Sequence, residues 1–176
     1  MRKYFAVMLI TGVVSCTNTE KKVAGNSDTT SNVKVVATDV ELKDNKVQAI
    51  YNGYITLKNA LVSSKFEDAQ KAASALKISL ADYKGCENTS LIADKIATAK
   101  DIKVQRKEFT ALSADVIALF KHADVVKGSI FVQHCPMANN GDGGDWLSGE
   151  RKIQNPYYGD EMMECGRVLE EIKSAK

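Results

Sequence analysis

The chain has 176 residues with a formal net charge of +2, and 44% of its residues are hydrophobic. Its charges form no basic stripe, so nothing predicts nucleic-acid binding. About 140 residues follow the first 38, enough for a single domain with a sizeable core.

The first 15 residues predict a secretory signal peptide. Arg2 and Lys3 precede an apolar run over residues 5–14, which is too short to span a membrane. The "VVSC" at its end resembles a bacterial lipobox, so we predict that Cys16 becomes the lipidated first residue. An ordinary signal peptide with an incidental Cys16 is the alternative. Lipid would anchor the protein at the bacterial cell envelope, on the periplasmic side or at the outer-membrane surface, without a transmembrane helix.

Composition divides the rest of the chain. Residues 16–38 contain the lipidated cysteine and a polar segment that predicts a flexible tether. Residues 39–176 are predicted to form a single helical domain, with a bundle over 39–127 and an ordered extension over 128–176. Seven of the 11 glycines lie in the extension, whereas the bundle contains only two.

Four helices are predicted by apolar residues that are spaced alternately three and four apart. These stripes cover residues 47–62, 66–83, 92–99 and 109–126. Ser64 and Glu67 stand three residues apart before the second stripe, as a capping box requires. Because short links favour antiparallel neighbours, we expect an all-α fold built on an up-and-down four-helix bundle.

The extension is predicted to contain a loop, a short strand and a helix. "SIFVQHC" favours a strand, which Pro136 ends. "NNGDGGDW" is typical of a loop and "NPYYG" of a turn. The final "DEMMECGRVLEEIKSA" predicts a helix with Met162, Cys165, Leu169 and Ile172 on one face.

The order of residues in this extension is distinctive. C-P-M-A, a glycine-rich loop, W-L-S, I-x-N-P-Y-x-G and M-x-x-C-G-x-V follow one another over residues 135–168. The matched positions are Cys135, Pro136, Met137, Ala138, Trp146, Leu147, Ser148, Ile153, Asn155, Pro156, Tyr157, Gly159, Met162, Cys165 and Gly166. This order resembles a bacterial family of uncharacterised domains in Bacteroidetes-type lipoproteins, which occur alone or joined to periplasmic adaptor subunits of heavy-metal efflux systems. The resemblance implies copper or silver as the metal and efflux adaptor components as partners.

The sulfur-containing side chains agree with this implication, because Cu(I) prefers thiolate, thioether and imidazole ligands. Cys135 and Met137 would come from one extended segment, and Met162 and Cys165 from one helical turn. Together they predict a four-sulfur site for Cu(I) or Ag(I). His134 is a weaker candidate ligand, because in a strand its side chain points away from that of Cys135.

A structural disulfide is the second interpretation. An oxidising envelope compartment favours a bridge between Cys135 and Cys165, which leaves Cys86 over once Cys16 is lipidated. The bridge would close a loop of about 30 residues and stabilise the fold by roughly 3 to 4 kcal/mol. A redox-switchable site, which binds metal only when reduced, is compatible with both interpretations.

The alternative function is that of a non-enzymatic interaction module. Trp146, Tyr157 and Tyr158 would then contact a partner or a small ligand. No enzyme is predicted, since His134 and Cys135 are adjacent in sequence and cannot face each other as base and nucleophile.

Overall fold

The computed structural model of the protein describes residues 39–174. Within this range there are four α-helices, five β-strands and two short 3-10 helices. The helices are α1 (Asn45–Val62), α2 (Phe66–Ala81), α3 (Glu87–Ala97) and α4 (Ile102–Phe120). The strands are β1 (Glu41–Leu42), β2 (Val125–Lys127), β3 (Ser129–Cys135), β4 (Gly144–Ser148) and β5 (Arg167–Lys173). The 3-10 helices are η1 (Asn139–Gly141) and η2 (Gly159–Glu161).

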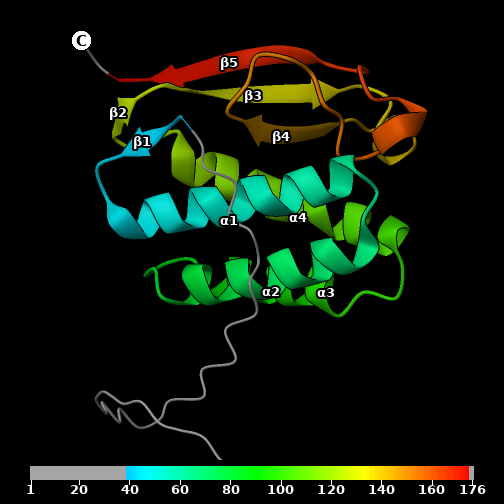
Figure 1. The fold of residues 1–176 in the computed structure, drawn as a ribbon, viewed down its shortest axis with the longest axis horizontal. Helices are drawn as coiled ribbons and strands as arrows, with labels where there is room; N and C mark the ends of the chain where they lie inside the picture. Colours follow the sequence, from blue (N-terminus) through cyan, green and yellow to red (C-terminus); the bar gives the residue numbers. More distant parts are fainter. Residues whose placement is uncertain (1–38, 175–176) are drawn as a thin grey trace, which may run out of the picture. The chain divides into compact units, whose positions relative to one another are not determined.

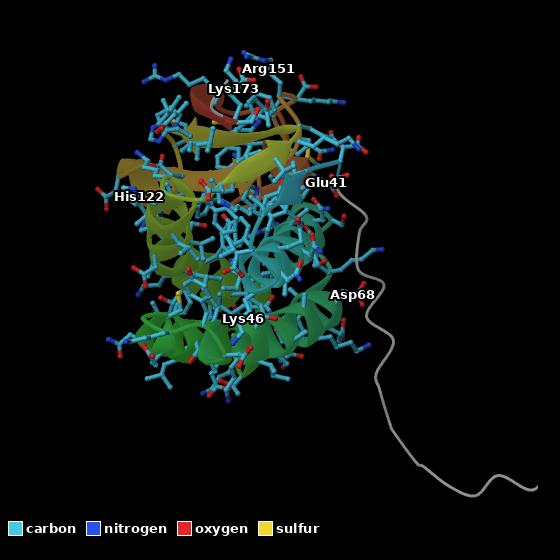
Figure 2. All side chains as sticks on the ribbon, turned by 90° about the vertical axis from the view of Figure 1, so that its left-hand side faces the viewer. Glu41, Lys46, Asp68, His122, Arg151 and Lys173 are labelled. Atoms are coloured by element: carbon cyan, nitrogen blue, oxygen red, sulfur yellow. The ribbon has the colours of Figure 1, made fainter. Side chains whose placement is uncertain are left out.

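These elements form three layers (Figure 1). Strands β4, β3 and β5 make an antiparallel sheet in that order, and β1 pairs with β2 in a second antiparallel sheet. Helices α1 and α4 lie against the three-stranded sheet, and α2 and α3 form the layer farthest from it (Figures 1 and 2). Each helix packs against the next one in the chain.

Aspartate side chains cap the N-termini of α1 and α4, the two helices that lie against the three-stranded sheet. The Asp44 carboxylate accepts hydrogen bonds from the amides of Lys46 and Val47 at 2.7 and 3.2 Å. The Asp101 carboxylate accepts one from the Val104 amide at 2.9 Å. These bonds satisfy amides that no helical carbonyl reaches, which is why α1 and α4 start where they do.

The expected capping box at the start of α2 does not form. Lys65 is the residue that precedes the helix, and its side chain makes no capping hydrogen bond. Ser64 has a φ of 53°, and its hydroxyl accepts a hydrogen bond from Arg106 at 2.9 Å. Ser64 therefore connects the α1–α2 turn to α4 instead of capping α2.

The core fills the space between the helices and the sheet. Its completely buried side chains include Ile50, Tyr54, Leu57, Leu61, Phe109, Leu112, Ile130, Trp146 and Leu147. The Tyr54 hydroxyl lies 2.7 Å from the Ser113 hydroxyl and accepts a hydrogen bond from the Leu147 amide at 3.1 Å. Because β4 is an edge strand, this tyrosine provides the Leu147 amide with a partner that no further strand supplies.

The expected all-α class is wrong. The four helices lie where the apolar stripes predicted them, but two antiparallel sheets accompany them within residues 39–174. The predicted strand over residues 129–135 is confirmed. The fourth stripe extends beyond its helix, because α4 ends at Phe120 and Val125–Lys127 forms β2.

The predicted C-terminal helix is also wrong. Gly166 has a φ of 148°, which ends any helical path, and Arg167–Lys173 pairs with β3 as strand β5. Met162 and Cys165 precede this strand, while Leu169 and Ile172 lie within it, so the four do not share a helical face. The predicted loop over residues 139–146 is likewise shorter than expected, because Gly144–Ser148 forms β4.

Some predictions fall on the part of the chain that is not described. The signal peptide over residues 1–15, the lipidation at Cys16 and the tether over 16–38 lie outside residues 39–174. No helix within the described range has the length and apolar character to cross a membrane.

Candidate metal or redox site at Cys135 and Cys165

The structure brings the two cysteines of the extension together. Cys135 is the last residue of β3 and is completely buried, whereas Cys165 is half-buried in the segment before β5. Their Sγ atoms lie 2.7 Å apart. Both interpretations of the motif require this proximity, because a bridge and a shared metal both need neighbouring sulfurs.

A tight turn leads the chain from Cys135 back to β4. The Ala138 carbonyl accepts hydrogen bonds from the amides of Gly141 and Gly143, each at 3.0 Å. Asn139 and Asn140 both have positive φ angles, and the Asn139 side chain donates to the Gly143 carbonyl at 2.8 Å. Asparagine and glycine adopt this left-handed backbone at little cost, which explains their concentration here.

Asn155 positions the second cysteine. Its side-chain nitrogen donates to the Cys165 carbonyl at 3.1 Å, and its side-chain oxygen accepts from the Tyr157 amide at 2.8 Å. Its backbone amide donates to the Met163 carbonyl at 2.9 Å. Asn155 is completely buried. The sequence interpretation included it only as a matched motif position and missed this role.

Gly166 and Gln133 hold the connection between β4 and β5 close to the sheet. A Cβ atom at Gly166 would lie 2.7 Å from the His134 carbonyl oxygen and 3.0 Å from the Trp146 ring, so only glycine fits. The buried Gln133 side chain donates to the Glu150 carbonyl at 2.8 Å. Its oxygen has no hydrogen-bond partner among the described residues. These contacts fix the segment that carries Cys165 over β3.

The two predicted methionine ligands differ in environment. Met137 is 54% exposed, directly after the Cys135–Pro136 step, and its carbonyl accepts a hydrogen bond from the Tyr158 hydroxyl. Met162 is half-buried and follows η2. Both thioethers belong to the segments that carry the two cysteines.

His134 is engaged elsewhere. Its Nδ1 atom lies 2.6 Å from a carboxylate oxygen of Asp145, the residue opposite it on β4. Alternation along β3 directs the side chains of His134 and Cys135 to opposite faces of the sheet. The structure therefore does not bring His134 to the two sulfurs.

Two of the three predicted contact aromatics are core residues. Trp146 is completely buried, and Tyr157 is only 6% exposed. The Tyr157 ring packs edge-on against Trp146 and Phe109, with centroid distances of 6.1 and 5.8 Å. The Tyr157 hydroxyl donates to the Asp145 carbonyl, and burial raises its pKa. Only Tyr158 of the three is half-buried and not part of the core, so these residues do not form an aromatic surface.

The thiol of Cys165 is not activated at rest. Its hydrogen bond with Cys135 raises the pKa of Cys165, burial adds to this increase, and a hydrogen bond from the Met137 backbone acts against it. A raised pKa disfavours the thiolate, which is both the nucleophile and the metal ligand. At rest, therefore, Cys165 keeps its proton and lies in a sulfur–sulfur hydrogen bond with Cys135.

The sulfurs fit a metal only after a small movement. Two thiolates that share one ion at about 2.3 Å each lie roughly 3.7 to 4.6 Å apart. The observed 2.7 Å is shorter, so binding requires Cys165 to move outward by about 1 to 2 Å. Within residues 39–174 there is no group of three or more His, Cys, Asp or Glu side chains with metal-binding geometry. Any ion here would therefore depend on two thiols and nearby thioethers.

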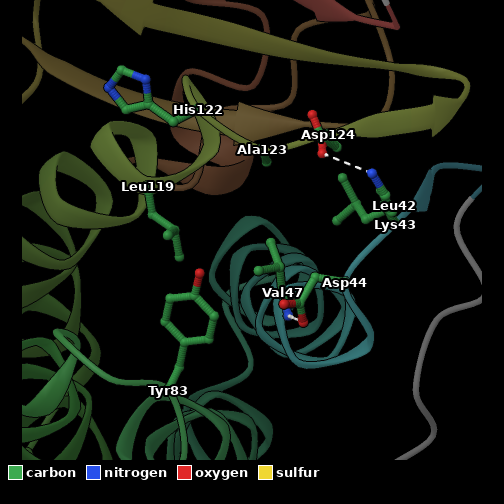
Figure 3. Close-up of a pocket in the computed structure, with 9 residues that line it drawn as sticks. All are labelled: Leu42, Lys43, Asp44, Val47, Tyr83, Leu119, His122, Ala123 and Asp124. Atoms are coloured by element: carbon green, nitrogen blue, oxygen red, sulfur yellow. Dashed lines mark hydrogen bonds and ion pairs between the residues drawn. The ribbon is translucent and has the colours of Figure 1, made fainter.

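Other cysteine and histidine residues lie away from this pair. Cys86 is buried at the start of α3, in the layer farthest from the sheet, and burial raises its pKa. His122 lines a cavity of about 440 Å³ between the ends of α1 and α4 (Figure 3). Figure 3 shows the Tyr83 hydroxyl pointing into this cavity and the Lys43–Asp124 ion pair at its edge.

Comparison with known protein families finds a similarity over the helical part of the chain. The sequence model of a family described as a protein of unknown function (DUF3347) matches residues 50–128. The chain is thus similar, over its helical part, to an uncharacterised domain family. The matched stretch ends before Cys135, so the motif of the extension is not part of it. No curated protein and no solved structure matches the chain.

Proposed function

We propose that this protein is a lipid-anchored protein of the bacterial envelope that binds Cu(I) or Ag(I) through Cys135 and Cys165 and has no enzymatic activity. The observation that supports this proposal is the 2.7 Å separation of the two sulfurs at the end of the sheet. Two thiols suit a soft monovalent ion, which accepts few ligands and prefers sulfur. Met137 and Met162 would complete the coordination on the accessible side.

In this proposal the oxidation state of the pair decides whether metal binds. The reduced thiols each release one proton and bind the ion as thiolates. A disulfide partner that accepts two electrons by thiol exchange would convert them to a bridge and abolish binding. The resemblance to domains joined to heavy-metal efflux adaptors makes such an adaptor the proposed recipient of the ion.

Competitive Cu(I) titration of the full chain tests this function. Under reduction, we expect one equivalent of Cu(I) to be removed from a chromophoric chelator, and Ag(I), which is not oxidised under these conditions, to compete for the same site. Cys135→Ser and Cys165→Ser should abolish this competition, whereas Cys86→Ser should not. Met137→Leu and Met162→Leu should each weaken binding. Failure of the reduced chain to compete, or binding that survives both cysteine substitutions, would refute the proposal.

A structural bridge is the second candidate role for the same pair. The complete burial of Cys135 favours it, because buried paired cysteines commonly hold a fold together. The protein would then be an interaction module whose extension is cross-linked. Mass spectrometry of the protein from its native compartment would show the loss of two hydrogens, and the reduced protein would unfold more easily without binding Cu(I).

A further inference from the structure

Lys58 on α1 is an unusual lysine. Its side chain is only 3% exposed, although lysine is rarely buried without a paired charge. Among the described residues it has no hydrogen-bond or ion-pair partner. Lys77, by contrast, is paired with Asp94 at 2.9 Å on the surface of the helical layer. The ammonium group of this largely covered side chain makes no direct ion pair within residues 39–174, although the charge of Glu150 acts on it.

Lys58 lines a cavity of about 350 Å³ between α1 and the turn that follows β4. The lining residues are Asp39, Ile55, Lys58, Asn59, Val62, Ser63, Ser148, Gly149, Glu150 and Gln154. At roughly 30 Å³ of liquid volume per water, this space corresponds to about twelve water molecules and lies within the size range of small-ligand sites. The cavity is therefore large enough for a small organic molecule.

A second unpaired polar group lies beneath the same turn. The buried Tyr51 hydroxyl has no hydrogen-bond partner in the described part of the chain. A Cβ atom at Gly149 would approach this hydroxyl to 2.9 Å, so glycine leaves the space between them open. Tyr51 and Lys58 are seven residues apart and project from the same face of α1.

The other lining residues define the character of a ligand. Ile55 and Val62 provide a buried apolar wall on α1. Asp39 and Glu150 are the other charged residues that line the cavity, and both are exposed at its rim. One buried cation with two acidic residues at the entrance disfavours a dianion such as phosphate. A singly charged anion with a hydrocarbon portion fits both the charge and the wall.

We propose that this cavity binds a small aliphatic monocarboxylate. Its carboxylate pairs with the Lys58 ammonium group, and its hydrocarbon chain contacts Ile55 and Val62. None of the lining residues belongs to the Cys135–Cys165 pair, so this site is independent of metal binding.

The protonation behaviour of Lys58 agrees with such a site. Burial lowers the pKa of Lys58 from 10.5 to about 8, and the nearby Glu150 partly opposes this decrease. Near neutral pH the side chain is still mostly protonated and available for an anion. A bound carboxylate would raise this pKa again, since an opposite charge stabilises the ammonium form.

NMR titration of the full chain tests the proposal with two probes. Butyrate represents a free acid, and N-acetylvaline represents the carboxylate at the end of a peptide; methyl butyrate and inorganic phosphate are controls at constant ionic strength. With isotope-labelled lysine, we expect the Lys58 signal and the Gly149 amide signal to shift and saturate with one or both carboxylates. The probe that binds more tightly indicates whether the carboxylate comes from a free acid or from the end of a peptide.

Matched variants separate the site from nonspecific effects. Lys58→Met should weaken binding at least tenfold, read from the Gly149 amide, whereas Lys71→Met on the exposed side of α2 should not change it. Raising the pH above the pKa of Lys58 should weaken carboxylate binding in the unmodified chain. The proposal is overturned if neither carboxylate gives a saturable shift, if phosphate binds equally well, or if Lys58→Met binds as tightly as the unmodified chain.

Discussion

At the scale of single residues, Asn155 organises the candidate site although it carries no reactive group. Its side chain connects the Cys165 carbonyl to the Tyr157 amide from a completely buried position. The sequence indicated the chemically distinctive residues, Cys135 and Cys165, because sulfur chemistry is recognisable from residue type. The role of Asn155 depends on which backbone groups lie beside it in space, and no spacing pattern indicates that.

Asn155→Ala should lower the free energy of unfolding by about 2 to 4 kcal/mol, because it leaves two buried backbone groups without partners. It should also weaken Cu(I) binding, since the segment that carries Cys165 loses its anchor. Urea denaturation followed by circular dichroism measures the first effect. The exposed Asn88 on α3 provides the control, and Asn88→Ala should change stability by less than about 0.5 kcal/mol. Equal effects of the two substitutions would contradict this role.

Metal affinity should depend steeply on pH. The hydrogen bond with Cys135 and burial raise the pKa of Cys165 above its ordinary value of 9.0, so the Cys165 thiol keeps its proton at neutral pH. Binding of Cys165 as a thiolate displaces its proton, and affinity should therefore rise at least roughly tenfold per pH unit between about pH 6 and 8. Ag(I) competition titrations at several pH values measure this slope. A flat profile would argue against a site made of two thiols.

Lys58 should make the fold less stable near neutral pH. Its folded-state pKa of about 8 lies below the unfolded value of 10.5, so the unfolded chain keeps its proton to higher pH. The resulting penalty is about 3 kcal/mol below pH 8 and is relieved as the pH rises towards about 10.5. Lys58→Met should therefore stabilise the protein near neutral pH, and its advantage should shrink by about pH 10. Denaturation of both proteins across this range provides the measurement, and a pH-independent difference would count against it.

At the scale of elements, the helices were predictable and the last strand was not. Stripes with helical spacing predicted α1 and α4, since no strand produces that period, although the fourth stripe ran past Phe120 into β2. The β5 sequence "RVLEEIK" satisfies both periods: Val168 and Ile172 are four apart, and every second residue of the strand also shares a face. The pairing of β5 with β3 and the positive φ of Gly166 decide in favour of a strand. A local sequence pattern shows neither the pairing nor the backbone angle. Strand β4 has only five residues beside a glycine-rich loop, which concealed it.

Gly166→Ala should disturb the docking of β5. The new Cβ atom would meet the His134 carbonyl and the Trp146 ring, and the backbone would be strained at positive φ. We expect a loss of about 2 to 4 kcal/mol and faster hydrogen exchange in β5. Gly85 has a φ of 95°, but no neighbouring atom lies within 4 Å of the place where a Cβ atom would stand, so Gly85→Ala isolates the backbone effect. That control should cost about 1 to 2 kcal/mol. Equal losses would show that the contacts at Gly166 are unimportant.

At the scale of the whole molecule, the helical layers and the sheet are joined by polar as well as apolar contacts. Tyr54 on α1 lies within hydrogen-bond distance of Ser113 on α4 and accepts from Leu147 on β4. Hydrophobic periodicity predicted that α1 and α4 have a buried side, but it could not indicate that part of this side packs against a sheet. The similarity to an uncharacterised family ends at Gly128, just before the main strands of that sheet begin.

Tyr54→Phe should loosen the attachment of the sheet to the helices. The substitution keeps the ring but leaves the buried Leu147 amide without an acceptor, at a cost of about 1 to 3 kcal/mol. Thermal or urea denaturation measures this loss. Tyr83→Phe is the matched control, because the Tyr83 hydroxyl points into the cavity of Figure 3 and makes no hydrogen bond among the described residues. A similar loss for both variants would indicate that the Tyr54 hydroxyl is not a connection between layers.

The position of Cys165 just before β5 has a mechanical consequence. Strand β5 is held to β3 by a ladder that runs from the Arg167–His134 pair to the Lys173–Ser129 pair. A force applied at the C-terminal side would open this ladder one pair at a time, beginning at Lys173. With the thiols free, nothing covalent would stop the opening at Arg167, and the force would reach the connection fixed by Asn155. A bond between Cys135 and Cys165 would stop the separation of β5 from β3 at that point. After oxidation, the force could therefore open the ladder but could not pull out the chain that precedes Cys165.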